Sequence, residues 1–225
     1  MDLKDLAGRA ISYTKAPEYA SGFIREAFNK AINGVGRLPG AVKSAERRVE
    51  QVAGDREEAI DLLISTHLKY AGAQGFVTNL GGLLAMAVLV PANVAGLALI
   101  QCHLVAGIAH LRGYDLADPR VRNAVLACMI GPDGVKRLVK KKKLPGTPYT
   151  LATAHAYDPA LNKEIATEVT NELITRAAGK RTVGVIGRRI PILGGGVGAV
   201  GDAYSTRKVG KYAANELRPQ KRKLN

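Results

Sequence analysis

The sequence contains no tryptophan, and aromatic residues make up only 5% of its 225 positions. Proteins that bind single-stranded nucleic acid stack the bases on aromatic side chains, so this scarcity disfavours that class. There are only two cysteines, Cys102 and Cys128, and both lie in apolar segments, which predicts reduced, buried thiols of a cytoplasmic protein instead of a disulfide framework. The first ten residues mix both charges and lack an apolar core, so we expect no secretory signal.

Acidic residues are scarce relative to basic ones. There are 19 Asp and Glu against 33 Lys and Arg, which gives a net charge of +14 at pH 7. Such an excess predicts an anionic partner: nucleic acid, acidic lipid headgroups or an acidic protein. The densest basic run consists of Lys136, Arg137, Lys140, Lys141, Lys142 and Lys143. Against nucleic acid this run would supply only non-specific phosphate contacts, and against a membrane about 1 kcal/mol for each cation near the surface. The alternative is a solvated helix end and loop.

Charge is absent altogether from residues 70–111, which contain no Asp, Glu, Lys or Arg. One continuous helix of that length would reach roughly 63 Å, about twice the thickness of a bilayer core. Pro91 lies near the middle and removes a helical hydrogen bond there. The segment therefore predicts an apolar hairpin of two helical arms, at about 75–90 and 92–111.

This apolar hairpin must be hidden either in a helical core or in lipid. The second arm carries Asn93, Gln101, His103 and His110, which are costly in hydrocarbon unless they are paired. Its small residues suit close helix packing in either environment. In the lipid alternative we expect the contacts to come from Leu80, Leu83 and Leu84 of the first arm, together with Lys140, Lys141, Lys142 and Lys143.

The rest of the chain predicts an all-α class. Apolar residues recur at helical spacing, and Asp55, Asp118 and Asp158 stand where helix N-caps are expected, the last two directly before proline. We expect helices at about 20–32, 41–53, 56–70, 119–130 and 160–178, and a small-residue helix near the carboxyl end. Residues 144–158 are expected to form a loop. No strand run or internal repeat is visible, so we predict one helical domain over 1–217, followed by a basic tail at 218–225.

Three blocks of this sequence resemble the EcsC family. They are GGLLAMAVLVPANVAGLALIQ (81–101), HLVAGIAHLRGYDLADPRVR (103–122) and IPILGGGVGAVGDAYSTRKVGKYA (190–213), within a resemblance that covers roughly 75–214. Asp202 departs from the family pattern, in which Asn is more usual at that position. The resemblance implies a mainly helical domain, and some members are encoded beside ABC-type transporter components. It therefore implies membrane association without supplying a mechanism.

A dense polar block follows the apolar hairpin. Its members are His103, His110, Arg112, Tyr114, Asp115 and Asp118. The two histidines are seven residues apart and share a helix face, so with the aspartates they are candidates for a metal site, and Arg112 for an anion site. Asp115 and Asp118 also weakly echo the paired aspartates that hold magnesium and a prenyl diphosphate. The alternative is structural: Asp118 caps a helix, Asp115 forms hydrogen bonds with backbone groups of the turn, and the histidines are hydrogen-bonded core residues.

The letters GVGAVG at 196–201 match the dinucleotide-binding fingerprint, but their context does not. Proline interrupts the approach, no strand precedes the glycines, and too little chain follows them for the rest of a binding unit. Close helix packing is the better interpretation.

The sequence thus predicts a cytoplasmic, membrane-associated accessory or lipid-contacting protein of the EcsC type, without a cofactor. The expected partners are an anionic membrane surface or lipid and a membrane transporter component, with no specific nucleic acid. The alternative is a metal-dependent enzyme that acts on a hydrophobic, prenyl diphosphate-like substrate in the apolar interior. There Asp115 and Asp118 would hold Mg²⁺, with Asp202 as a further candidate.

Overall fold

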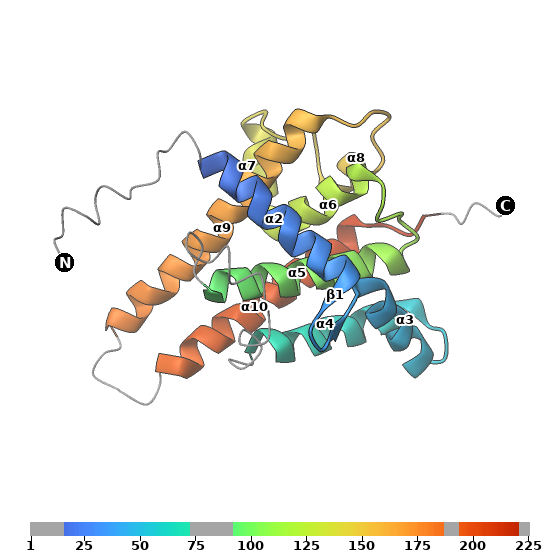
Figure 1. Ribbon diagram of the computed structural model, residues 1–225, viewed down its shortest axis with the longest axis horizontal. Helices are drawn as coiled ribbons and strands as arrows, with labels where there is room; N and C mark the ends of the chain where they lie inside the picture. Colours follow the sequence, from blue (N-terminus) through green and yellow to red (C-terminus); the bar gives the residue numbers. More distant parts are fainter. Residues whose placement is uncertain (1–15, 73–91, 187–193, 221–225) are drawn as a thin grey trace.

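The computed structural model describes residues 16–72, 92–186 and 194–220, and most of these residues are helical (Figure 1). The predicted all-α class is confirmed. In chain order the elements are α2 (Ala16–Asn33), β1 (Gly34–Val35), β2 (Leu38–Pro39), α3 (Ala41–Gln51), α4 (Arg56–Gly72), α5 (Ala92–Leu111), α6 (Pro119–Ile130), α7 (Pro132–Lys140), α8 (Pro148–Ala152), α9 (Pro159–Ile186) and α10 (Gly194–Glu216).

Helix α5 is the core of the molecule and coincides with the predicted second arm of the apolar hairpin. It packs against α2, α3, α4, α6, α9 and α10. Its window Val94–Leu111 has a mean hydropathy of 1.8, long and apolar enough to cross a membrane, yet 94% of that window is buried inside the protein. No other helix in the described ranges meets the same criteria. The first arm, with Leu80, Leu83 and Leu84, lies outside the described residues.

Glycines let the helices around α5 approach closely. A Cβ added at Gly107 of α5 would lie 2.8 Å from Leu63 Cδ2 of α4, closer than two carbons can sit. A Cβ at Gly210 of α10 would lie 2.9 Å from Ile64 Cγ1 of α4. The small residues therefore serve helix packing within the domain, as in other tightly packed interiors.

Three aspartates begin helices in the way the sequence predicts. Asp55 Oδ1 accepts hydrogen bonds from the Glu57 and Glu58 backbone N–H groups at 2.9 and 3.0 Å. Asp118 Oδ1 accepts from Arg120 N at 2.8 Å, and Asp158 Oδ1 accepts from Ala160 N at 2.9 Å. Each carboxylate satisfies backbone donors that the first helical turn leaves without a partner.

The structure differs from the sequence-based expectations in four segments, and one of these is α7 (Pro132–Lys140), which is not among the expected helices. Residues 34–39 form a small antiparallel hairpin, which depends on Gly34 because its φ is +88° and a Cβ there would meet Leu38 O at 2.7 Å. The expected loop at 144–158 contains the short helix α8, and α9 runs on to Ile186 instead of ending near 178. Burial accounts for α8, because its Pro148, Leu151 and Ala152 are buried.

The chain after α10 packs back onto the domain before the described residues end. Leu217 is fully buried, and Gln220 N donates to Arg112 O at 2.8 Å. Gln220 Nε2 donates to the Tyr114 hydroxyl at 2.9 Å. The tail predicted from residue 218 therefore begins as part of the packed structure.

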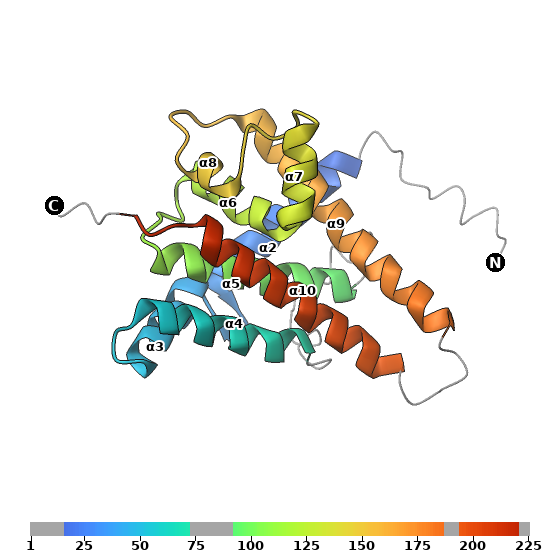
Figure 2. The ribbon, with the colours of Figure 1, turned by 180° about the vertical axis from the view of Figure 1, so that it is seen from behind.

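Helices α9 and α10 extend to one side of the molecule (Figures 1 and 2). The last turns of α9 and the first turns of α10 reach beyond the other described helices on that side. We call residues 179–186 and 194–201 the α9–α10 end. The end of α4 and the start of α5 also lie toward this side in both views.

Candidate functional site

His103, from the predicted polar block, lies in the core and is paired with a second histidine. Its Nδ1 is 2.8 Å from His67 Nε2 of α4, and its Nε2 is 2.8 Å from Pro39 O of β2. Both rings are fully buried. His110, one heptad further along α5, pairs with Glu46 of α3. These two histidines therefore join α5 to different neighbours and do not share a site.

The other four members of the block, Arg112, Tyr114, Asp115 and Asp118, line one hollow of about 770 Å³ between the α5–α6 turn and the end of the chain. Each holds the local structure. Arg112 pairs with Glu57 and donates to Ala214 O at 3.3 Å, while Asp115 accepts from Ala117 N at 2.8 Å.

The Asp118 carboxylate accepts hydrogen bonds both from the backbone at the start of α6 and from a neighbouring cation. Arg120 Nε donates to its two carboxylate oxygens at 3.0 Å, and this guanidinium lowers the pKa of the Asp118 carboxyl below its usual range. Within the described ranges, no three His, Cys, Asp or Glu side chains come close enough together to hold a metal ion. The magnesium site of the enzyme alternative stays a prediction.

Asp202 lies far from this hollow. It stands in the first part of α10, whereas the hollow is closed by Gln220, just beyond the other end of that helix. From Asp202 to Glu216 the helix alone spans about 21 Å. The structure thus does not bring Asp202 together with Asp115 and Asp118.

The buried cysteines are also outside any site. Cys102 and Cys128 are free and buried, as predicted, and the Cys102 thiol is 3.3 Å from Met129 Sδ. Burial raises the pKa of Cys102 to about 12 and also raises that of Cys128. Neither thiol forms the thiolate that a nucleophile or a metal ligand requires near neutral pH.

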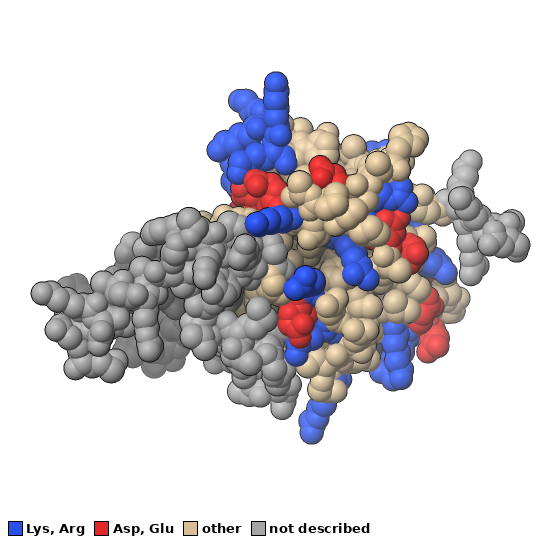
Figure 3. Space-filling model, turned by 45° about the horizontal axis from the view of Figure 1, so that its top comes forward, with Lys and Arg blue, Asp and Glu red and all other residues tan. Residues whose placement is uncertain are grey.

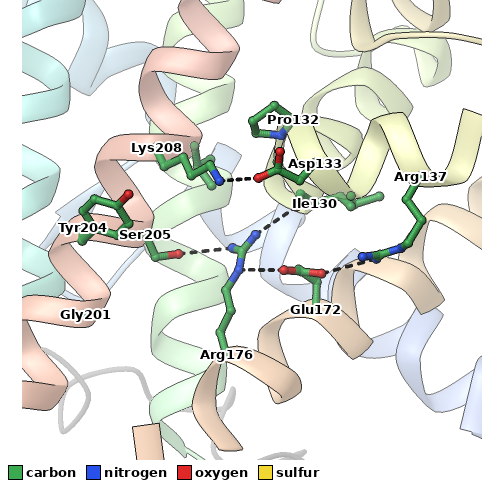
Figure 4. Close-up of a pocket in the computed structure, with 13 residues that line it drawn as sticks. Ile130, Pro132, Asp133, Arg137, Glu172, Arg176, Gly201, Tyr204, Ser205 and Lys208 are labelled. Carbon is green, nitrogen blue, oxygen red and sulfur yellow. Dashed lines mark hydrogen bonds and ion pairs between the residues drawn. The ribbon is translucent and has the colours of Figure 1, made fainter. Parts of the chain in front are cut away.

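A second hollow, of about 440 Å³, lies where the α6–α7 junction meets α9 and α10 (Figure 4). We call it the α9–α10 hollow. Arg176 of α9 occupies its floor and connects three elements. Its Nε donates to Glu172 Oε1 at 3.1 Å, Nη1 to Ser205 Oγ of α10 at 3.2 Å, and Nη2 to Ile130 O at the end of α6 at 2.9 Å.

Two further ion pairs stand in the wall of the α9–α10 hollow. Lys208 Nζ donates to Asp133 Oδ2 at 2.6 Å and lowers the pKa of that carboxyl. Arg137 Nη2 is 3.6 Å from Glu172 Oε2, which is an ion pair but longer than a hydrogen bond. Three cations thus face two carboxylates around one cavity.

Gly131 shapes the same hollow from the backbone side. It ends α6 and precedes Pro132, the first residue of α7, with a φ of +83° that favours glycine. A Cβ at this position would lie 3.4 Å from Arg176 Nη2. The turn between α6 and α7 therefore also leaves room for the guanidinium.

The predicted basic run lies at the surface, at the end of α7 and in the turn after it. Its exposed members are Lys136, Arg137, Lys140, Lys141, Lys142 and Lys143. Figure 3 shows a group of Lys and Arg side chains at the upper left of one face, and α7 lies on the upper side of the molecule in Figure 1. Lys143 donates to Glu164 and Glu168 of α9 at 2.8 and 3.0 Å, and these carboxylates raise the pKa of its ammonium group.

Sequence reasoning singled out Arg137 in the basic run, but not Arg176, Ser205 or Lys208. One sequence signal was available. Between Glu172 and Asp202 there is no acidic residue, whereas Arg176, Lys180, Arg181, Arg188 and Arg189 all fall there. Such a one-sided charge pattern indicates a basic region in this part of the sequence.

The fold defines a class of protein, an all-α domain built around one buried apolar helix. A family model described as the EcsC protein family matches residues 13–224, nearly the whole chain, and the chain belongs to this family. The resemblance seen in the sequence is thereby confirmed. None of the curated proteins and none of the solved structures matches the chain.

Proposed function

We propose that this EcsC domain is a cytoplasmic, membrane-associated accessory protein that contacts acidic lipid through the α9–α10 end. One observation carries the proposal: among the described helices, those that extend furthest from the core are the end of α9 and the start of α10, and residues 173–201 around them contain cations and no Asp or Glu. Lys180 and Arg181 fall on the last turns of α9, and no Asp or Glu interrupts the stretch before Asp202. An anionic surface attracts such a segment by about 1 kcal/mol for each nearby cation.

Apolar side chains on α10 supply a hydrophobic contribution at the same end. Val200 and Tyr204 are 70% and 71% exposed, the two most exposed of the large apolar residues in the described part of the chain. They are four residues apart and therefore lie on one face of α10. A modest hydrophobic contribution and a modest electrostatic one together hold a peripheral protein where either alone is marginal.

The apolar first arm of the predicted hairpin supports the same orientation. Residues 73–91 join the end of α4 to the start of α5, and both of these described helix ends lie toward the α9–α10 end (Figures 1 and 2). We therefore keep Leu80, Leu83 and Leu84 as proposed lipid contacts. A transporter component at the membrane remains our proposed protein partner.

The test is co-sedimentation of the full chain with vesicles of phosphatidylglycerol and phosphatidylcholine, compared with vesicles of phosphatidylcholine alone, at low and high salt. We expect binding to the acidic vesicles, weakened by salt because screening shortens the reach of the charges. Val200→Ser and the pair Leu83→Ser and Leu84→Ser should each reduce the fraction that resists salt. Wild-type protein that stays in the supernatant with acidic vesicles at low salt would overturn the proposal.

A matched control is available on α7. Val139 is 36% exposed and lies in the predicted basic run, away from the α9–α10 end. Val139→Ser makes the same chemical change as Val200→Ser and should leave vesicle binding unaltered. A loss with Val139→Ser but not with Val200→Ser would assign the contact to α7 instead.

A further inference from the structure

We propose that the α9–α10 hollow binds the phosphodiester headgroup of a single anionic lipid. The inference deepens the proposed membrane contact and rests on it. The hollow lies between α9 and α10, at the base of the α9–α10 end, so a headgroup held there would leave its acyl chains directed along the exposed apolar face of α10.

Ser205 provides a donor with no other described use. Its Oγ accepts hydrogen bonds from Arg176 Nη1 and from Gln101 Nε2, both at 3.2 Å. Two donors use both lone pairs of the hydroxyl, so its own hydrogen is left to donate. Ser205 lines the hollow, and a phosphate oxygen there would accept that hydrogen.

The two arginines of the hollow are arranged for different tasks. Arg176 is held by contacts to α6, to α10 and to Glu172 of its own helix, which fixes its guanidinium before any ligand arrives. The Arg137 side chain is 51% exposed and only loosely paired with Glu172, so it can turn toward a ligand at little cost. A guanidinium presents its donors in a planar fork that matches the oxygens of a phosphate.

The charges around the hollow select the ligand class. Arg137, Arg176 and Lys208 contribute three positive charges, while Asp133 and Glu172 contribute two negative ones. The remaining single positive charge matches a phosphodiester, which carries one negative charge. The first turn of α7 adds backbone donors, since its N-terminus has no side-chain cap.

The size and the lining of the cavity fit a headgroup with the start of its chains. A volume of about 440 Å³ lies in the usual range for small-molecule sites, roughly 300–1,000 Å³. Ile130, Pro132 and Val209 give it apolar walls. Tyr204 lies in its lining and is 71% exposed, and Val200 lies one turn earlier on α10.

The experiment measures binding of monomeric lipid to the full chain by titration calorimetry. The ligands are dihexanoyl phosphatidylglycerol and dihexanoyl phosphatidylcholine, each below its micelle concentration, and inorganic phosphate. We expect the phosphatidylglycerol to bind at least tenfold more tightly than either of the others. Arg137→Gln and Ser205→Ala should each weaken its binding at least fivefold, while Lys141→Gln, which removes the same charge from an exposed residue outside the hollow, should not.

Each remaining outcome overturns the inference. Equal affinity for the two lipids would mean that the hollow does not recognise the charge of the headgroup. Equal affinity for phosphatidylglycerol and inorganic phosphate would mean that the hollow binds phosphate and not a lipid. Full affinity in Arg137→Gln, with an unchanged melting temperature, would remove the hollow as the site. Wild-type protein that sediments with acidic vesicles but ignores the monomeric lipid would retain the proposed membrane contact and reject the headgroup site.

Discussion

His67 and His103 form a buried pair whose contacts require more hydrogens than two neutral rings possess. His67 Nδ1 is 2.7 Å from Leu63 O, the two rings meet at 2.8 Å, and His103 Nε2 is 2.8 Å from Pro39 O. Three contacts need three hydrogens, and two neutral imidazoles carry two. A third would place a positive charge in a dry interior beside the Arg48 guanidinium, so the pair stays neutral at the expense of one contact.

This pair predicts a loss of stability in acid. Burial lowers the pKa of His67 to about 3 and that of His103 to about 4, from an ordinary value of 6.5. Below pH 6.5 the two histidines therefore bind protons in the unfolded chain and not in the folded chain. The pair stabilises the fold fully above pH 6.5, and the free energy of unfolding falls between pH 6.5 and 4 by up to about 1.4 kcal/mol per pH unit for each histidine.

Urea unfolding of wild type and His67→Gln between pH 4 and 8 measures the effect. The glutamine does not titrate, so the variant should show a shallower acid slope even if it is less stable at pH 7. His155, which is exposed, provides the control: His155→Gln should keep the wild-type slope. Identical slopes for wild type and His67→Gln would show that the histidine pair does not cause the fall in the free energy of unfolding at acid pH.

Asp118 tests whether the polar block is structural or chemical. Because it accepts from Arg120 N at the start of α6, Asp118→Ala should cost about 1 kcal/mol in the free energy of unfolding. Asp118→Asn keeps an acceptor and should cost less. Since each aspartate already has a structural partner, magnesium should leave the melting temperature unchanged. A rise with magnesium that disappears in Asp115→Asn would favour the metal-dependent enzyme instead.

At the scale of whole elements, local rules predicted most of the fold. Proline at position 91 and the absence of charge before Arg112 predicted α5 with the bounds it has. Aspartate caps predicted where α4, α6 and α9 begin. These signals succeed because hydrogen bonding of the first turn and the solvation of apolar side chains are decided by residues close together in sequence.

The features that local rules missed depend on contacts between distant segments. Four helices contribute to the α9–α10 hollow, through Ile130, Arg137, Arg176 and Ser205. Their spacing along the chain does not predict that these residues lie together. The polar block shows the converse. His103 and His110 share a helix face as predicted, but they have different partners. His103 contacts α4 and β2, whereas His110 contacts α3. Helix geometry gives a common direction, and the neighbouring elements determine the role.

At the scale of the whole molecule, the lysines at 140–143 and the α9–α10 end are separate charged regions, whereas Arg137 of the basic run lines the α9–α10 hollow. Lys143 is bonded to Glu164 and Glu168 near the start of α9, whereas the other end of that helix is Ile186. From residue 168 to residue 186 an α-helix rises about 27 Å. That distance is several times the Debye length at physiological salt, about 8 Å. A flat membrane that contacts one region therefore need not interact electrostatically with the other.

Two charge-matched variants decide which region faces the membrane. Lys180→Gln with Arg181→Gln removes two cations from the last turns of α9, and Lys141→Gln with Lys142→Gln removes two exposed cations from the basic run. Both lower the net charge equally, so an effect of total charge alone would weaken binding to phosphatidylglycerol vesicles to the same degree in each. We expect the α9 pair to lose binding at low salt and the basic-run pair to retain it. Replacing Lys140, Lys141, Lys142 and Lys143 together with Gln extends the second arm of the comparison. If that variant loses binding while the α9 pair retains it, acidic lipid contacts the basic run, and the α9–α10 end is not the membrane-facing part of the protein.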